Sequence, residues 1–361
     1  MSLAKSIVED CLHITAKDNV SINLYPHNLA LAEEIAEECF KKGADVMMSL
    51  YTDKFLSSLY DHLSEESLRQ PSAYCRSLTE TSTAEIFMSG TYDPSILRTI
   101  DPKKLAADNL GETKAHLPLS KERRIRTLNI GLALVTKPRA RSYGFNYERW
   151  NKMMLAATSV DYGKLAKLGR ALRERLSDAR HFTVTGPGQT NLSFDISGRK
   201  WYLSDGVVDH EDIENEDLDD GLPAGSLVAA PLEDSAEGRI TFNAGTPIMG
   251  RLSKGLQLRF EAGRVVSFKG DVSTAAVKKM WESGAGDKDR IGFFGIGFNP
   301  KAEPGYTVNN VANGVVSIGI GGNQFIRGKN RPGVLVLDSI VGATVKADGK
   351  TIVQKGKIVS A

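Results

Sequence analysis

The sequence predicts two domains of different class. Residues 1–180 predict an α/β domain with a mainly parallel sheet, and residues 181–361 predict a β-rich α+β domain with a curved or barrel-like sheet. The chain of 361 residues is too long for one ordinary hydrophobic core. Strand-like and helix-like segments alternate in the first half, whereas the later segments are short, alternate in polarity and are separated by glycine.

The first half opens with a strand–helix–strand unit. Residues 20–24 alternate in polarity and predict a strand, and residues 29–42 repeat apolar side chains at helical spacing. Gly43 predicts the end of that helix, and residues 44–50 predict the next strand. Such a unit is typical of a right-handed crossover between parallel strands. Further elements are predicted as strands at residues 84–89 and 128–134 and as a helix at residues 159–176.

The second half predicts antiparallel hairpins. Their turns are expected at Gly186-Pro187-Gly188, at residues 261–264 and at Asp348-Gly349. Only residues 273–282 predict a helix in this half. Residues 209–220 contain eight acidic side chains in twelve positions, and we interpret them as a solvated loop, with a cation site as the alternative.

Composition narrows the classes of partner. Hydrophobic residues make up 41% and charged residues 25% of the chain, as in a globular protein. A net charge of +2 does not favour nucleic-acid binding, and no apolar run approaches the ~18 residues of a membrane span. The cysteines Cys11, Cys39 and Cys75 form no paired motif. We therefore predict a cytoplasmic protein with reduced thiols that binds neither nucleic acid nor membrane.

Few side chains after residue 210 suit metal or nucleophilic chemistry. No histidine follows His210 and no cysteine follows Cys75, so the later segments lack the ligands that bind transition metals best. Residues 334–341 predict a buried strand that carries Asp338, which needs a polar partner there. Ser317 has no histidine near it in sequence, and a catalytic triad would need a histidine from elsewhere in the chain.

Several short motifs occur together in a characteristic order. They are Gly186-Pro187-Gly188-x-Thr190-x-Leu192, Asp205-Gly206-Val207-Val208-Asp209, Leu222-Pro223-Ala224-Gly225-Ser226, Asp234-Ser235-Ala236-Glu237-Gly238 and Phe260-Glu261-x-Gly263-Arg264. In this order the chain resembles the M29 family of metallo-aminopeptidases, the aminopeptidase T/S type, over nearly its whole length. The resemblance implies a homodimer and a two-metal site in the second domain. The implied ligands are two Glu, two His and one Asp, with a Tyr nearby.

Matching these motifs position by position shows that most implied ligands are substituted. The first family Glu, in a Pro-x-Gly-Glu motif, corresponds to Ser226, and the second, in a Gly-Glu motif, corresponds to Phe293. The first family His, which precedes Ile-x-x-Gly, corresponds to Ser317. The family Tyr falls near Asn323 or Gln324.

The last implied pair, His-x-Asp, corresponds to Val336-Leu337-Asp338. Asp338 is thus the one family ligand that the sequence retains. One carboxylate cannot hold two metal ions, and Phe293 and Val336 make two of the implied ligand positions apolar. A metal-bound hydroxide, the nucleophile of such hydrolases, has no visible source.

We therefore predict an M29-like protein that has lost the two-metal peptidase site and keeps an interdomain cleft for a peptide or small metabolite. The expected cleft positions are Ser226, Phe293, Ser317, Asn323, Val336 and Asp338. No cofactor is expected, and any that binds would be divalent Zn, Co, Mn or Fe. Two alternatives stay open: a metal-dependent hydrolase rebuilt around Asp338 with His210, and a structural or regulatory subunit. Whether catalysis remains is left open.

Overall fold

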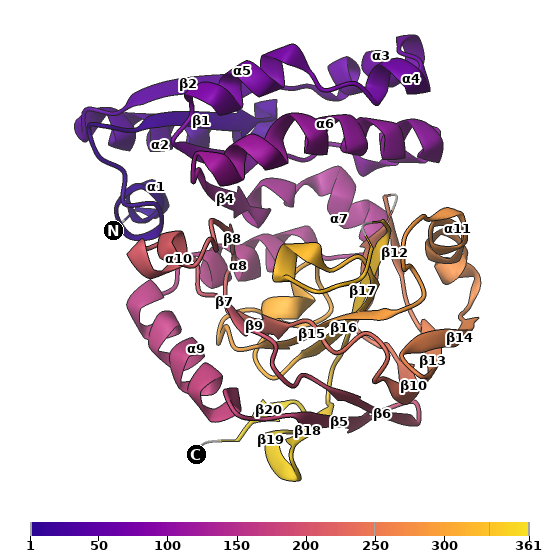
Figure 1. Cartoon of the computed structure of the whole chain (residues 1–361). Coiled ribbons are helices and arrows are strands. Elements are labelled where there is room, and N and C mark those ends of the chain that lie inside the picture. Colours follow the sequence, from indigo (N-terminus) through magenta and orange to yellow (C-terminus); the bar gives the residue numbers. More distant parts are fainter. Residues whose placement is uncertain (1, 249, 332, 360–361) are drawn as a thin grey trace. The chain divides into compact units, whose positions relative to one another are not determined.

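A computed structural model describes residues 2–248, 250–331 and 333–359 of the chain (Figure 1). The chain divides into two compact units that interleave along the sequence. The first unit comprises Met1–Ser142, Asn146–Asn151 and Gly206–Leu222, and the second comprises Tyr143–Phe145, Lys152–Asp205 and Pro223–Ala361. The boundary predicted at residue 180 does not fall at a change of unit: residues 152–205 belong to the second unit, and residues 206–222 return to the first.

The first unit is built on one parallel sheet, which confirms the predicted α/β class. Its strand order is β2-β1-β3-β4-β8. The strands are β1 (Asn19–Leu24), β2 (Asp45–Leu50), β3 (Ala84–Met88), β4 (Arg126–Ile130) and β8 (Asp219–Leu222). The predicted strand at residues 128–134 is too long, because the chain leaves β4 in a 3-10 turn at Gly131–Leu134.

Helix α1 (Leu3–Ser6) precedes the first strand, and further helices connect the strands of this sheet, as expected for crossover connections. They are α2 (Leu29–Lys41), α3 (Asp53–His62), α4 (Glu65–Leu68), α5 (Ala73–Thr81), α6 (Pro102–Glu122) and α7 (Lys137–Tyr143). After α2 the chain turns at Gly43, whose φ of 81° lies in the left-handed region that favours glycine. The predicted end of the first long helix is therefore confirmed.

The two faces of the parallel sheet differ in polarity. Directly paired residues of neighbouring parallel strands point to the same side. Ser21 pairs with Glu85, and Asn23 pairs with Phe87, which in turn pairs with Asn129. These side chains form a polar face, while the alternate positions of the same strands carry buried apolar side chains. A parallel sheet is usually apolar on both faces, so this polar face requires an explanation.

The acidic segment at residues 209–220 is partly exposed, as predicted, but it forms a helix and a strand and not a loop throughout. Asp209 begins helix α10 (His210–Glu214), where its side chain and that of Asp212 form a reciprocal capping box. The chain then enters β8, which pairs in parallel with β4. Asp220 is buried, and its Oδ2 accepts the backbone N–H of Gly206 at 2.7 Å. Three of the acids thus serve as caps or as a buried acceptor, while Glu211, Glu214, Glu216 and Asp219 are exposed. The prediction of a single later helix was wrong.

The second unit contains three antiparallel sheets. An eight-stranded sheet has the order β14-β13-β10-β6-β5-β18-β19-β20, a five-stranded sheet has the order β17-β16-β15-β9-β7, and β11 pairs with β12. Over the described residues these sheets have free edges and form no closed barrel. The strands of the eight-stranded sheet are β5 (His181–Gly186), β6 (Thr190–Asp195), β10 (Glu237–Thr241), β13 (Gln257–Glu261), β14 (Arg264–Lys269), β18 (Thr344–Ala347), β19 (Lys350–Gln354) and β20 (Lys357–Ile358).

The remaining strands include the four that carry most of the expected site positions. They are β7 (Tyr202–Ser204), β9 (Ser226–Ala229), β11 (Thr246–Ile248), β12 (Arg251–Ser253), β15 (Ile291–Gly297), β16 (Val316–Gly321) and β17 (Leu335–Ile340). Aromatic rings join the two large sheets: Phe294 of β15 lies 5.3 Å from Phe182 of β5 and 5.0 Å from Phe194 of β6, between ring centroids. The five-stranded sheet is thereby held against the eight-stranded one by apolar packing.

Three further helices complete the described chain: α8 (Tyr147–Thr158), α9 (Tyr162–Leu176) and α11 (Ala275–Ser283). The start of α9 is set by Asp161, whose side chain accepts the backbone N–H of Lys164. The predicted hairpins around residues 186–188, 261–264 and 348–349 are confirmed by the pairing of their strands. None of the helices described here has both the length and the apolar character needed to cross a bilayer.

Candidate functional site

The family site positions fall on neighbouring strands of the five-stranded sheet. Ser226 begins β9, Phe293 lies in β15, Ser317 lies in β16, and Asp338 lies in β17. Asn323 follows β16 directly. In an antiparallel sheet, directly paired residues point to the same side, so the register decides which of these side chains can meet.

Three of the expected positions share one face. Gly295 pairs with Ser317, Gly297 pairs with Ser226, and Phe293 lies two residues from Gly295 along β15. Ser317 also pairs with Ser339, and their hydroxyl oxygens lie 2.8 Å apart. Both serines are buried. This face therefore brings together serine hydroxyls and a phenyl ring.

Asp338 and Val336 point to the opposite face of the same sheet. Asp338 pairs with Ile318 and Val336 pairs with Ile320, and both partners alternate with Ser317 along β16. The positions of β17 that share the Ser317 face are Leu335, Leu337 and Ser339. The six expected positions therefore do not converge on one point. The role of Asp338 as a metal ligand stays a prediction.

The surroundings of Asp338 explain why the pKa of its carboxyl group is raised. The side chain is buried, and its Oδ1 accepts the backbone N–H of Ser339 at 2.7 Å. Burial raises the pKa of Asp338 to about 6, while hydrogen bonds from Thr246 and Ser339 oppose that rise. The buried carboxyl thus satisfies part of its hydrogen-bonding need locally.

The side chains at the positions of the implied metal ligands do not fit a two-metal centre. Such a centre needs carboxylate or imidazole ligands that converge on each ion. The described face offers instead Ser226, Ser317, Ser339, Phe293 and Leu337. Across the described part of the chain, no group of three or more His, Cys, Asp or Glu side chains could hold a metal ion.

His210, the histidine proposed for a rebuilt site, begins α10 in the first unit. Its Nδ1 lies 3.5 Å from Glu214 Oε1, and its side chain is 85% exposed. The imidazole therefore interacts within its own helix turn, as an ordinary surface residue does.

The apolar substitution at Phe293 is accommodated by packing. Phe293 is 5% exposed and belongs to a buried cluster with Val228, Ala230 and Ile326. Its ring stacks on that of Phe325, with centroids 6.3 Å apart. Close by, Asn323 is fully buried and its Oδ1 accepts the backbone N–H of Asn330. Its Nδ2 has no hydrogen-bond partner among the described residues.

Comparison with known proteins identifies the family. The model of the thermophilic metalloprotease (M29) family matches residues 1–298 of this chain. The chain belongs to the M29 family. The resemblance inferred from the motifs is thereby confirmed. The substitutions at the implied ligand positions are therefore differences between this chain and the pattern of its own family.

Two solved structures share the fold of this M29 member. Wild-type AmpT from Thermus thermophilus is 17% identical with a TM-score of 0.75, and the match covers 99% of this chain and 98% of that chain. The 2,5-dihydroxypyridine dioxygenase from Pseudomonas putida KT2440 is 13% identical with a TM-score of 0.64, covering 99% and 96% of the two chains. No curated sequence matches the chain.

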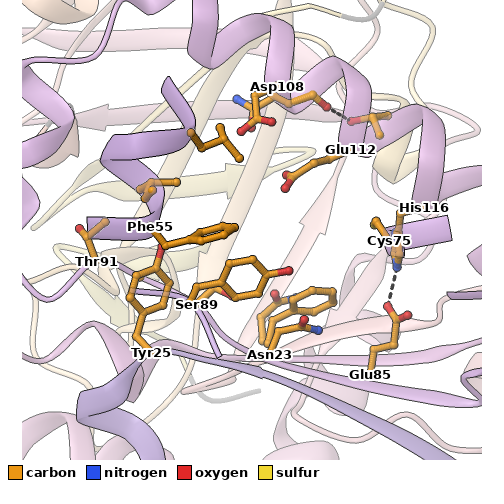
Figure 2. A pocket seen from close by; sticks show the side chains of 18 of the residues that line it. Asn23, Tyr25, Phe55, Cys75, Glu85, Ser89, Thr91, Asp108, Glu112 and His116 are labelled. Atoms are coloured by element: carbon orange, nitrogen blue, oxygen red, sulfur yellow. Dashed lines mark hydrogen bonds and ion pairs between the residues drawn. The ribbon is translucent and has the colours of Figure 1, made fainter. Parts of the chain in front are cut away.

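The first unit contains a cavity that sequence reasoning missed. Its volume is about 870 Å³, and it lies over the polar face of the parallel sheet, lined also by side chains of α3, α5 and α6 (Figure 2). Two patterns could have indicated it. Asn23 and Asn129 interrupt strands that should be apolar, and Asp108, Glu112 and His116 repeat every four residues along α6.

Acidic side chains dominate the electrostatics of this cavity: Glu85 is buried, Asp108 is half-buried and Glu112 is exposed. His116 Nε2 lies 2.5 Å from Glu85 Oε2, and this hydrogen bond raises the pKa of His116 against the opposing effect of burial. Burial, and then the neighbouring Asp108, raise the pKa of Glu112. Burial also raises the pKa of Asp219 to about 6, opposed by a hydrogen bond from Asn129. The cavity itself is lined by three of these carboxyl groups, those of Glu85, Asp108 and Glu112, while Asp219 is connected to it through Asn129.

Proposed function

We propose that this M29 protein has lost two-metal peptidase activity and binds a peptide or a small metabolite without cleaving it. The observation that carries the proposal is the donor set of the five-stranded sheet. Serine hydroxyls and apolar side chains stand at the positions where the family resemblance implies carboxylates and imidazoles. Neutral hydroxyls are poor ligands for Zn or Co, and they cannot supply the charge that stabilises a metal-bound hydroxide.

The register of β17 adds to this argument. If the family's His-x-Asp pair is matched to the residues that share the Ser317 face, the pair becomes Leu337 and Ser339 rather than Val336 and Asp338. That match removes the last carboxylate from the set. The loss of metal chemistry then involves every implied ligand position.

A structural or regulatory subunit is the second candidate, and one observation favours it. Phe293 fills its surroundings, packed on Val228, Ala230 and Ile326. Such packing is what a chain retained for its fold would show. The interdomain cleft, the homodimer and the cytoplasmic location inferred from the sequence stay predictions, and light scattering on the purified protein would measure the oligomeric state.

The decisive experiment measures metal content and hydrolysis together. The purified chain is equilibrated in turn with Zn, Co, Mn and Fe(II), dialysed, and analysed by elemental mass spectrometry. The same samples are assayed against a set of amino-acid 4-nitroanilides. We expect well below one equivalent of each metal and no hydrolysis above background.

The variant Asp338→Asn separates the remaining outcomes. Two equivalents of metal with chelator-sensitive hydrolysis would refute the proposal. One equivalent that is lost in Asp338→Asn would instead support a site rebuilt around that carboxylate. One equivalent retained in the variant would place the metal elsewhere, and the proposal would then rest on the hydrolysis assay alone.

A further inference from the structure

One wall of the first unit's cavity is aromatic. The rings of Tyr25 and Tyr51 stack with centroids 6.4 Å apart, and Phe55 meets Tyr51 edge-on at 5.8 Å. Phe87, from the polar face of the sheet, also lines the cavity. Aromatic rings present a negative face, so they attract organic cations as well as apolar groups.

The charges that line the cavity are not balanced. Each cation already has an acceptor: His116 contacts Glu85, and the Arg139 guanidinium donates to the carbonyl oxygen of Thr91 at 2.6 Å. Two carboxyl groups of α6 have no such cationic partner within the described residues. Asp108 accepts a hydrogen bond from the neutral Tyr60 hydroxyl at 2.6 Å.

Glu112 is the second of these acids. No hydrogen bond or ion pair joins its carboxyl group to any residue that the structure describes. Figure 2 shows its side chain directed from α6 toward the aromatic side chains that include Phe55. Glu112 is exposed, and its carboxylate lines the cavity without a cationic partner, which a bound cation would supply.

A second, independent observation comes from the sheet. Asn23 is 7% exposed and lines the same cavity. In the described structure its side-chain amide has no hydrogen-bond partner, although buried amides nearly always have one. The amide is therefore available to a molecule that occupies the cavity, as donor or as acceptor.

We propose that this cavity binds a small organic ammonium ion with an apolar body. The ammonium group would lie against Glu112 and Asp108, the apolar body would lie on the rings of Tyr51 and Phe55, and Asn23 would supply a hydrogen bond. A volume of about 870 Å³ is in the range of small-molecule sites. The proposal concerns the first unit alone, so it holds whether or not the second unit binds metal.

Isothermal titration calorimetry on the full chain tests the proposal with two matched probes. The first is 2-phenylethylammonium, and the second is 2-phenylethanol, which has the same apolar body without the charge. We expect saturable binding of the ammonium and binding of the alcohol that is weaker by about tenfold or more. Affinity for the ammonium should fall as the pH is lowered, because protonation of Glu112 removes the opposing charge.

Substitutions then locate the site. Glu112→Gln should weaken ammonium binding by about tenfold. The exposed Glu122, at the end of the same helix, supplies the matched control Glu122→Gln, which should bind as the wild type does. Because Phe55 is 52% exposed, Phe55→Leu tests the aromatic wall with little risk to folding, and Phe40→Leu on α2 is its control.

The proposal is overturned if 2-phenylethylammonium shows no saturable binding at millimolar concentration. It is also overturned if the alcohol binds as tightly, or if Glu112→Gln and Phe55→Leu both leave the affinity unchanged. Thermal melting confirms that each variant is folded. If Glu112→Gln fails to fold, the Phe55→Leu pair and the pH dependence of the wild type decide the outcome.

Discussion

The pair formed by Glu85 and His116 supports a specific prediction about stability. Glu85 is 2% exposed in the middle of the parallel sheet, and His116 Nε2 is its one side-chain hydrogen-bond partner within the described residues. Replacing His116 by Gln leaves the buried carboxylate without its cation. Breaking a fully buried pair costs about 3–5 kcal/mol. Because the His116 side chain is 27% exposed and water can reach the site, we expect about 2–3 kcal/mol here.

The pH dependence of this effect has a definite sign. The hydrogen bond from Glu85 raises the pKa of His116 above its ordinary value of 6.5, with further contributions from Asp219 and Glu112 and an opposing one from burial. A raised histidine pKa stabilises the folded state fully below the unfolded value, and the contribution is lost as the pH rises through the folded value. The difference between wild type and His116→Gln should therefore shrink above neutral pH.

Hydrogen exchange in urea measures this difference without assuming that both units unfold together. Amides of β3 report the first unit at several pH values below and above 6.5. His62→Gln, at an exposed position on α3, is the matched control and should be neutral. The double variant Glu85→Gln/His116→Gln should recover much of the lost stability. Equal stability of wild type and His116→Gln at every pH would refute the reasoning.

Two further predictions concern the second unit. Burial raises the pKa of Asp338 to about 6, so its ionisation costs stability as the pH rises from about 4 to 6. The variant Asp338→Asn should therefore stabilise the protein at pH 7 by up to about 2–3 kcal/mol. Urea unfolding at pH 4 and pH 7 measures this difference, and an effect that does not change with pH would contradict the prediction. A Cβ on Gly321 would lie 1.8 Å from the carbonyl oxygen of Val334 at a φ of 111°, so Gly321→Ala should cost about 2 kcal/mol or more. Gly163→Ala on α9, where the nearest atom would be 3.5 Å away, is the control and should be neutral or slightly stabilising; thermal melting of both variants measures the difference, and equal melting temperatures would contradict the prediction.

Much of the fold could be predicted because local signals coincide with the tertiary result. The helix that ends before Gly43, the hairpin turn at Asp348-Gly349 and the helix that ends at Leu176 each combine apolar periodicity with a cap or turn residue. Such signals depend on neighbouring residues and need no long-range partner.

The acidic segment shows where local reasoning fails. The many acidic side chains at residues 209–220 predict a segment that is exposed to solvent. Part of this segment nevertheless forms β8, which pairs in parallel with β4, a strand about ninety residues earlier in the chain. Pairing at that separation leaves no local trace in the sequence. For the same reason the return of residues 206–222 to the first unit could not be found from composition.

By itself, the sequence determined the family, the two fold classes and the absence of histidine after His210, because motif order and residue identity are properties of the chain alone. Only the tertiary structure decided which side chains share a face. A shift of one residue in a strand moves a side chain to the opposite side, and this separates Asp338 from Ser317. The cavity around Glu112 likewise exists only because α6 packs over a polar sheet face formed by strands that are distant in sequence.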